Sequence, residues 1–150
     1  MAGGAETIHA TCVAIGDHGV LIRGPSGAGK SDLALRLIHA PPVPGLGQSR
    51  LVCDDRVQLI VKDGMLWAGT APNLAGKLEI RGVGIVSVDH VASAPVRLVV
   101  EACGTADMPR MPEPDIGVPL LGREVPAVSL PLCEASAVAK VFMALRTAIA

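Results

Sequence analysis

The residues from position 24 to position 31 have the types and spacing that bind phosphate groups. They fit the pattern G-x-x-x-x-G-K-[ST], the phosphate-binding P-loop. In such a loop several backbone N–H groups and a helix N-terminus face one anion, the lysine reaches the β- and γ-phosphates, and the final hydroxyl is a ligand for Mg²⁺. The sequence therefore predicts a site for ATP and Mg²⁺ made by Gly24, Pro25, Ser26, Gly27, Ala28, Gly29, Lys30 and Ser31.

The elements around this loop are those that a P-loop needs. The apolar run at 20–22 predicts a strand that leads into it, and residues 31–39 predict a helix that ends before Pro41 and Pro42. The alternative is a chance match in a chain with 17 glycines. The strand before the loop and the helix after it favour the functional interpretation.

Two adjacent carboxylates, Asp54 and Asp55, follow a short apolar strand at 51–53. This is the place of a Walker B acid, which binds Mg²⁺ directly or through water. At a strand end both carboxylates can approach one site, so one could hold the metal while the other accepts a proton from an attacking hydroxyl. The alternative is a solvated turn that Asp54 or Asp55 caps.

Three further residues could take part in the chemistry. Glu79 could complete the Mg²⁺ ligands, and Arg81 could stabilise charge on a phosphoryl group in transfer. Taken alone, these two residues could equally form a surface ion pair. His9 is a weaker signal, because a lone histidine near a strand is more often packed or exposed than functional.

The composition restricts the class of protein. The chain has 150 residues, half of them hydrophobic and 1% aromatic, and its net charge is −1. This predicts one domain over 1–150 with an aliphatic core, and it disfavours nucleic-acid binding. No run is apolar enough to span a membrane, and the N-terminus does not resemble a signal peptide. The four cysteines have no metal-binding spacing and are expected to be reduced and buried, so we expect a cytoplasmic protein.

The order of the predicted elements favours a mixed α/β fold. We expect residues 1–6 to be frayed and strands at 8–15, 20–23, 51–53, 57–61, 65–68, 85–88, 96–101 and 125–132, the last at a sheet edge. Residues 104–124 are expected to be a long loop, and 134–149 a helix with an apolar face. Because helices are few, the sheet should be antiparallel or mixed rather than doubly wound.

Four segments together resemble the catalytic domain of bacterial HPr kinase/phosphorylase. They are Ile8-His9, the stretch 20–31 with the P-loop, the stretch 51–57 with both aspartates, and Leu78-Glu79-Ile80-Arg81-Gly82-Val83-Gly84-Ile85. The last segment looks like the signature of that family and is far more specific than a P-loop. The resemblance covers residues 8–132 and implies an HPr kinase/PEP carboxykinase-like fold: a P-loop-containing mixed β-sheet with a P-loop helix and a C-terminal helix.

The resemblance also implies a reaction and a role for each residue. The family phosphorylates a serine of HPr, the phosphocarrier of the sugar phosphotransferase system, and can return the phosphate to inorganic phosphate, giving pyrophosphate. Asp54 would be the base, or the acid in reverse, and His9 would interact with Asp54. Asp55, Glu79 and Ser31 would lie at the metal, with Lys30 and Arg81 supporting transfer. The chain would be a short form with only the catalytic domain, and a homo-oligomer, since the family is typically hexameric.

Two other functions fit part of the same pattern. A P-loop kinase of small molecules would use the same nucleotide site with a closed acceptor pocket. A nucleotide-binding regulatory module without turnover would need Lys30 but not Asp54. The presence of Asp54, Asp55, Glu79 and Arg81 together favours catalysis.

Overall fold

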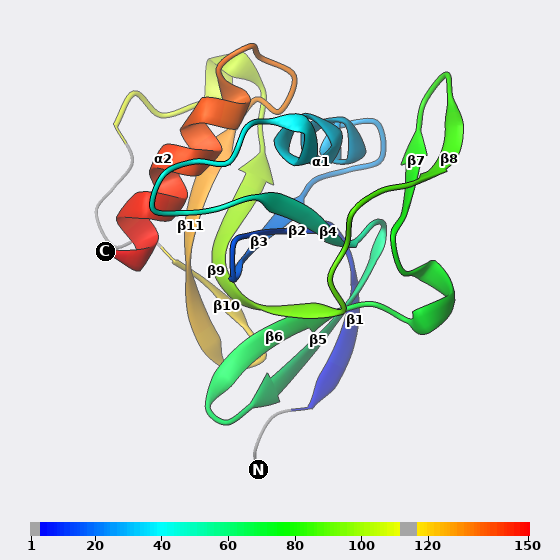
Figure 1. Cartoon of the computed structure of the whole chain (residues 1–150). Coiled ribbons are helices and arrows are strands. Elements are labelled where there is room, and N and C mark those ends of the chain that lie inside the picture. Colours follow the sequence, from blue (N-terminus) through cyan, green and yellow to red (C-terminus); the bar gives the residue numbers. More distant parts are fainter. Residues whose placement is uncertain (1–3, 112–116) are drawn as a thin grey trace.

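A large mixed β-sheet with two helices on one side forms the body of the molecule (Figure 1). The computed structural model describes residues 4–111 and 117–150. Within them, nine strands join in one sheet, in the order β1-β5-β6-β9-β3-β2-β4, with β11 beside β9 and β10 beside β11. The strands are β1 (Ala5–His9), β2 (Thr11–Ile15), β3 (His18–Arg23), β4 (Ser49–Cys53), β5 (Arg56–Lys62), β6 (Met65–Gly69), β9 (Ser93–Ala102), β10 (Gly117–Leu120) and β11 (Arg123–Leu130).

The sheet is mixed, as the sequence predicts. β3 and β11 run parallel to β9, and the other pairs are antiparallel. β2 and β3 form a hairpin in front of the phosphate loop. Neither is an edge strand, and nearly all their residues are buried, because side chains pack against both faces of the sheet.

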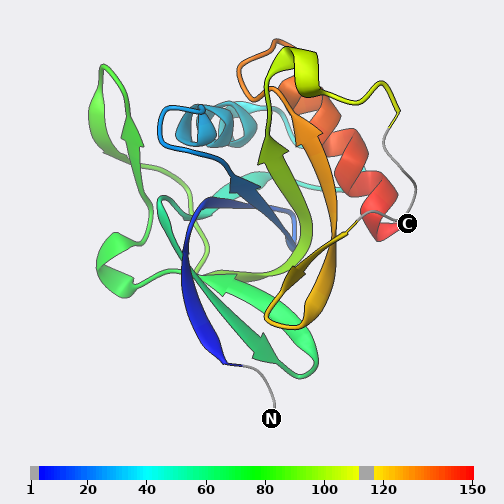
Figure 2. The ribbon, with the colours of Figure 1, turned by 180° about the vertical axis from the view of Figure 1, so that it is seen from behind.

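Helices α1 (Lys30–His39) and α2 (Ala137–Ile149) cover the same face of the sheet, as Figures 1 and 2 show from opposite sides. α1 begins after Gly29 and ends before Pro41, where the proline ring prevents its continuation. The apolar stripe predicted for α2 is confirmed: Val141 and Leu145 are buried. No helix in the described part of the chain is long and apolar enough to cross a membrane.

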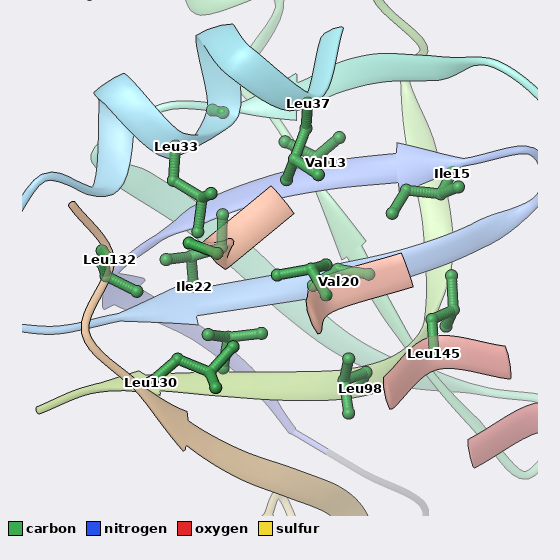
Figure 3. Packing of buried hydrophobic residues seen from close by; sticks show 14 of the residues in the cluster. Val13, Ile15, Val20, Ile22, Leu33, Leu37, Leu98, Leu130, Leu132 and Leu145 are labelled. Carbon is green, nitrogen blue, oxygen red and sulfur yellow. The ribbon is translucent and has the colours of Figure 1, made fainter. Parts of the chain in front are cut away.

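The main core lies between these helices and the sheet. Figure 3 shows Leu33 and Leu37 of α1 pointing toward the strands, with Leu145 of α2 approaching from the other helix. Alternate residues of β2 and β3 meet them from the sheet, while the residues between belong to a second core on the opposite face. The buried side chains contributed by the strands of the large sheet are Val13, Ile15, Val20, Ile22, Leu51, Leu98, Val100 and Leu130.

A separate two-stranded hairpin stands beside this body. It consists of β7 (Lys77–Ile80) and β8 (Gly84–Ser87) and follows a short 3₁₀ turn, Pro72–Leu74. Figure 1 shows the hairpin reaching away from the sheet at the end where α1 begins. Leu78 is completely buried in the main core and attaches the hairpin to it.

Several predicted boundaries were wrong. The expected strand at 8–15 is two strands, because the chain leaves β5 after His9 and joins β3 and β4 from Thr11 onward. Ala5 and Glu6, predicted to be frayed, pair with β5.

The expected loop 104–124 contains a 3₁₀ turn, Thr105–Asp107, and strand β10, while its residues 112–116 lie outside the described part. β11 is not a simple edge strand, since it pairs with β10 over 123–126 and with β9 over 127–130. Its Pro126 lies opposite Gly117 in the β10 pairing.

Candidate active site

A cleft of about 500 Å³ opens where four strands meet the start of α1. β3 ends there and enters the phosphate loop, β4 ends there before the two aspartates, and the junction between β1 and β2 lies between them. The β7–β8 hairpin contributes the opposite wall. The cleft is lined by His9, Thr11, Ser26, Gly27, Gly29, Lys30, Ser31, Asp32, Leu35, Asp54, Asp55, Glu79, Ile80, Arg81 and Cys133.

The phosphate loop has a backbone that only glycine adopts easily. Gly27 and Gly29 have φ of 84° and 99°, in the left-handed region. A Cβ at Gly29 would also lie 2.8 Å from the Cys133 Sγ. Lys30 is 7% exposed, and its Nζ donates hydrogen bonds to the carbonyl oxygens of Gly24 (2.7 Å) and Pro25 (3.0 Å). The lysine thus curls back over its own loop.

Asp54 is held by three hydrogen bonds from three different elements. Its Oδ1 accepts from the hydroxyls of Ser31 (2.7 Å) and Thr11 (2.9 Å), and its Oδ2 accepts from the backbone N–H of Glu79 (3.3 Å). Asp54 is half-buried. The structure therefore places one carboxyl group directly against the first turn of the phosphate-loop helix.

Asp55 has a different environment from its neighbour. It is exposed, and its φ of 72° lies in the left-handed region that aspartate tolerates better than most residues. Its Oδ1 lies 2.7 Å from the Nε2 of His9. The resemblance implies a contact of His9 with Asp54, whereas the structure shows one with Asp55. His9 is the last residue of β1, which pairs with β5, and the next residue, Ala10, donates its backbone N–H to the carbonyl oxygen of Asp55.

The β7–β8 hairpin brings Glu79 and Arg81 to the cleft. Both side chains are exposed and line the cleft. Leu78, the neighbouring residue in β7, is buried in the main core and fixes the base of the hairpin. The alternative of a surface ion pair is not seen, because Glu79 and Arg81 are not among the ion pairs of the described residues. The structure therefore brings most of the residues that the sequence singled out to one cleft; of the phosphate loop, Gly24, Pro25 and Ala28 do not line it.

Sequence reasoning missed Thr11 and Cys133. Thr11 is the one hydroxyl residue in the otherwise apolar strand β2, two positions after His9. A single hydroxyl in such a strand could have identified Thr11 as a candidate site residue. Cys133 was expected to be buried, but it is exposed in the cleft, because the segment between β11 and α2 passes over the phosphate loop. Cys12 and Cys53 are buried as expected, and burial raises the pKa of both thiols.

Comparison with known proteins agrees with this architecture. Residues 3–147 match the family model of the HPr Serine kinase C-terminal domain. The chain is 47% identical over 83 residues to the HPr kinase/phosphorylase of Streptococcus thermophilus, a match covering 55% of this chain and 25% of that protein. The HPr kinase/phosphorylase of Limosilactobacillus reuteri is 42% identical over 84 residues, with 55% and 24% covered. The matches thus span about a quarter of the length of these relatives.

A solved structure shares the whole fold. The Hpr(Ser) kinase/phosphatase from Coxiella burnetii superimposes with a TM-score of 0.78 at 27% identity, covering 95% of this chain and 89% of that one. The mixed sheet and its two helices are therefore arranged much as in that protein. This chain belongs to the family of HPr serine kinase C-terminal domains.

Proposed function

We propose that this chain is a kinase that transfers the γ-phosphoryl group of ATP to a serine of an HPr-like phosphocarrier protein. Family membership supports the reaction class. The observation that carries the proposal is the 2.7 Å contact between the Ser31 hydroxyl and Asp54, because it puts a carboxyl group at the phosphate loop. An acceptor hydroxyl that attacks a nucleotide held in this loop would meet that carboxyl.

The residues of the cleft suit Mg²⁺. Ser31, Asp55 and Glu79 line it and offer only oxygen atoms, which this ion prefers. In the described part of the chain, no three acidic, histidine or cysteine side chains lie close enough to hold a metal alone. Mg²⁺ commonly takes several ligands from water and substrate phosphates, so this arrangement fits it. When bound, the ion would supply positive charge beside the phosphates.

The transfer follows from where the side chains lie. Asp54 accepts the proton of the serine hydroxyl, whose oxygen forms a bond to the γ-phosphorus while the bond to the bridging oxygen breaks and ADP leaves. Lys30 exchanges the two carbonyl oxygens it now contacts for phosphate oxygens, and Arg81 offsets charge from the opposite wall. We assign His9 to Asp55, whose carboxyl it holds.

The experiment is transfer of label from γ-labelled ATP to purified HPr, with a Ser→Ala version of HPr as the acceptor control. We expect acid-stable label on HPr alone. Asp54→Asn should abolish transfer but keep nucleotide binding, whereas Lys30→Ala should weaken binding. Asp17→Asn, an exposed aspartate in the turn between β2 and β3, should leave both unchanged. Adding inorganic phosphate to labelled HPr tests the reverse reaction, which would release labelled pyrophosphate.

Two results would contradict the proposal. Tight ATP binding without label on HPr would favour a small-molecule kinase. If Asp54→Asn keeps the function of the wild-type protein and Lys30→Ala loses that function, the result would favour a nucleotide-binding module without turnover. A homo-oligomeric assembly, a cytoplasmic location and the lack of nucleic-acid binding remain predictions.

A further inference from the structure

Thr11 presents a buried hydroxyl to the carboxyl group of the site. Its side chain is 1% exposed, and its Oγ1 donates to Asp54 Oδ1 at 2.9 Å. A buried hydroxyl without a partner is costly, so this hydrogen bond also satisfies Thr11 itself. The two residues are 43 positions apart in the chain, and the contact exists only because β2 lies beside β4.

The position of this hydroxyl is fixed by the sheet. Thr11 lies opposite Ile22 in β3, two residues before Gly24, and the next residue, Cys12, lies opposite Cys53 in β4. The β-branched side chain of threonine also restricts its own χ1 rotation. Thr11 therefore offers a rigid donor between the strand that leads into the phosphate loop and the strand that leads to Asp54.

The other donor to the same oxygen is Ser31. In the proposed function Ser31 is a ligand of Mg²⁺, so its hydroxyl would turn from Asp54 to the metal. Thr11 would then be the side-chain donor that stays on Oδ1, with the Glu79 N–H on Oδ2 at 3.3 Å. The χ2 rotation of an aspartate is broad, so a carboxyl without such a donor samples many orientations.

We infer that Thr11 is a positioning residue that holds the Asp54 carboxyl in the orientation needed to accept the serine proton. The inference rests on the proposed kinase function. In this role Thr11 acts through Asp54 rather than on the reacting atoms. Its loss should therefore slow the transfer step without weakening nucleotide binding.

The test compares Thr11→Val, which has nearly the same shape but no hydroxyl, with Thr11→Ser, which keeps the hydroxyl. For Thr11→Val we expect kcat for HPr phosphorylation to fall about ten- to a hundred-fold, the range for a lost hydrogen bond to a charged group. The KM for ATP should change by less than about twofold, because the phosphate loop is untouched. Thr11→Ser should restore most of kcat. Ser49→Ala removes another buried hydroxyl, at the far end of β4, and should leave kcat unchanged.

Crystal structures of Thr11→Val and Thr11→Ser give a readout that does not depend on activity. We expect the Asp54 carboxyl to rotate or become disordered in Thr11→Val and to keep its orientation in Thr11→Ser. If the wild-type protein labels HPr and Thr11→Val keeps its kcat, the inference is wrong and the proposed function stands. If the wild-type protein labels no acceptor, the proposed function fails. An unchanged orientation of the Asp54 carboxyl in the crystal structure of Thr11→Val would overturn the positioning role.

Discussion

Single residues in this cleft differ in how firmly the protein holds them. Asp54 is half-buried and accepts three hydrogen bonds, whereas Asp55 and His9 are exposed and contact each other across 2.7 Å. Two neighbouring carboxyl groups thus have separate environments, because Asp54 accepts from hydroxyl and backbone donors whereas Asp55 contacts His9. The firmly held Asp54 is suited to proton transfer, which depends on orientation. The exposed Asp55 is suited to contacts that can adapt.

The contact between His9 and Asp55 should contribute little to stability. The two side chains are 50% and 64% exposed, so water screens their attraction. In a double-mutant cycle with His9→Ala and Asp55→Ala, measured by urea unfolding, we expect a coupling free energy below about 1 kcal/mol. A coupling free energy above about 2 kcal/mol would mean that the contact between His9 and Asp55 contributes substantially to stability.

The cysteines should differ in their reaction with N-ethylmaleimide. Burial raises the pKa of the Cys12 and Cys53 thiols, so little reactive thiolate is present near neutral pH, and the folded chain also hinders the reagent. Cys133 is exposed in the cleft and should be modified first, and saturating ATP should slow its modification. Peptide mapping by mass spectrometry measures this. Equal labelling of Cys12 and Cys133 in the native protein would contradict it.

At the scale of elements, one arginine joins the phosphate-loop helix to the segment before α2. Arg36 of α1 donates to the carbonyl oxygens of Leu132 and Glu134, on either side of Cys133, and to Asp32 one helical turn back. These bonds fix the segment that packs against Gly29. The wall of the cleft at the phosphate loop therefore depends on a contact between elements almost a hundred residues apart.

Replacing Arg36 with Met keeps an unbranched apolar stem but removes the guanidinium group and its hydrogen bonds. We expect Arg36→Met to lower the free energy of unfolding by about 1–3 kcal/mol, because two partly buried carbonyl oxygens lose a charged donor. Urea unfolding followed by the fluorescence of Trp67, the single tryptophan, measures the loss. Arg123→Met, at an exposed position that begins β11, serves as the control and should cost less than about 0.5 kcal/mol. Equal costs for the two variants would show that Arg36 does not join the elements.

At the scale of the whole molecule, stability depends on the core between the two helices and the sheet. Leu145 of α2 is completely buried there, whereas Met143, two residues away on the same helix, is 57% exposed. We expect Leu145→Ala to cost about 2–5 kcal/mol in the free energy of unfolding, and Met143→Ala less than about 0.5 kcal/mol. Urea unfolding compares them. Similar costs would place α2 away from the sheet.

The sequence predicted those parts of the protein that depend on neighbours along the chain. The phosphate loop between its strand and helix, the aspartates after a buried strand and the apolar stripe of α2 were all correct, because spacing and hydrophobic period are local properties. The predicted mixed sheet is also confirmed. The boundaries near residue 10 and the strand β10 were missed, since pairing with distant strands decides them.

The tertiary structure alone decided which residues meet in the cleft. Thr11 reaches Asp54 because β2 lies between β3 and β4 in the sheet. His9 contacts Asp55 rather than Asp54 because the chain turns at a left-handed residue. The segment carrying Cys133 passes over the phosphate loop. Local sequence patterns specify the chemistry that each side chain can offer. The strand order brings distant positions within hydrogen-bond distance, and no local pattern encodes it.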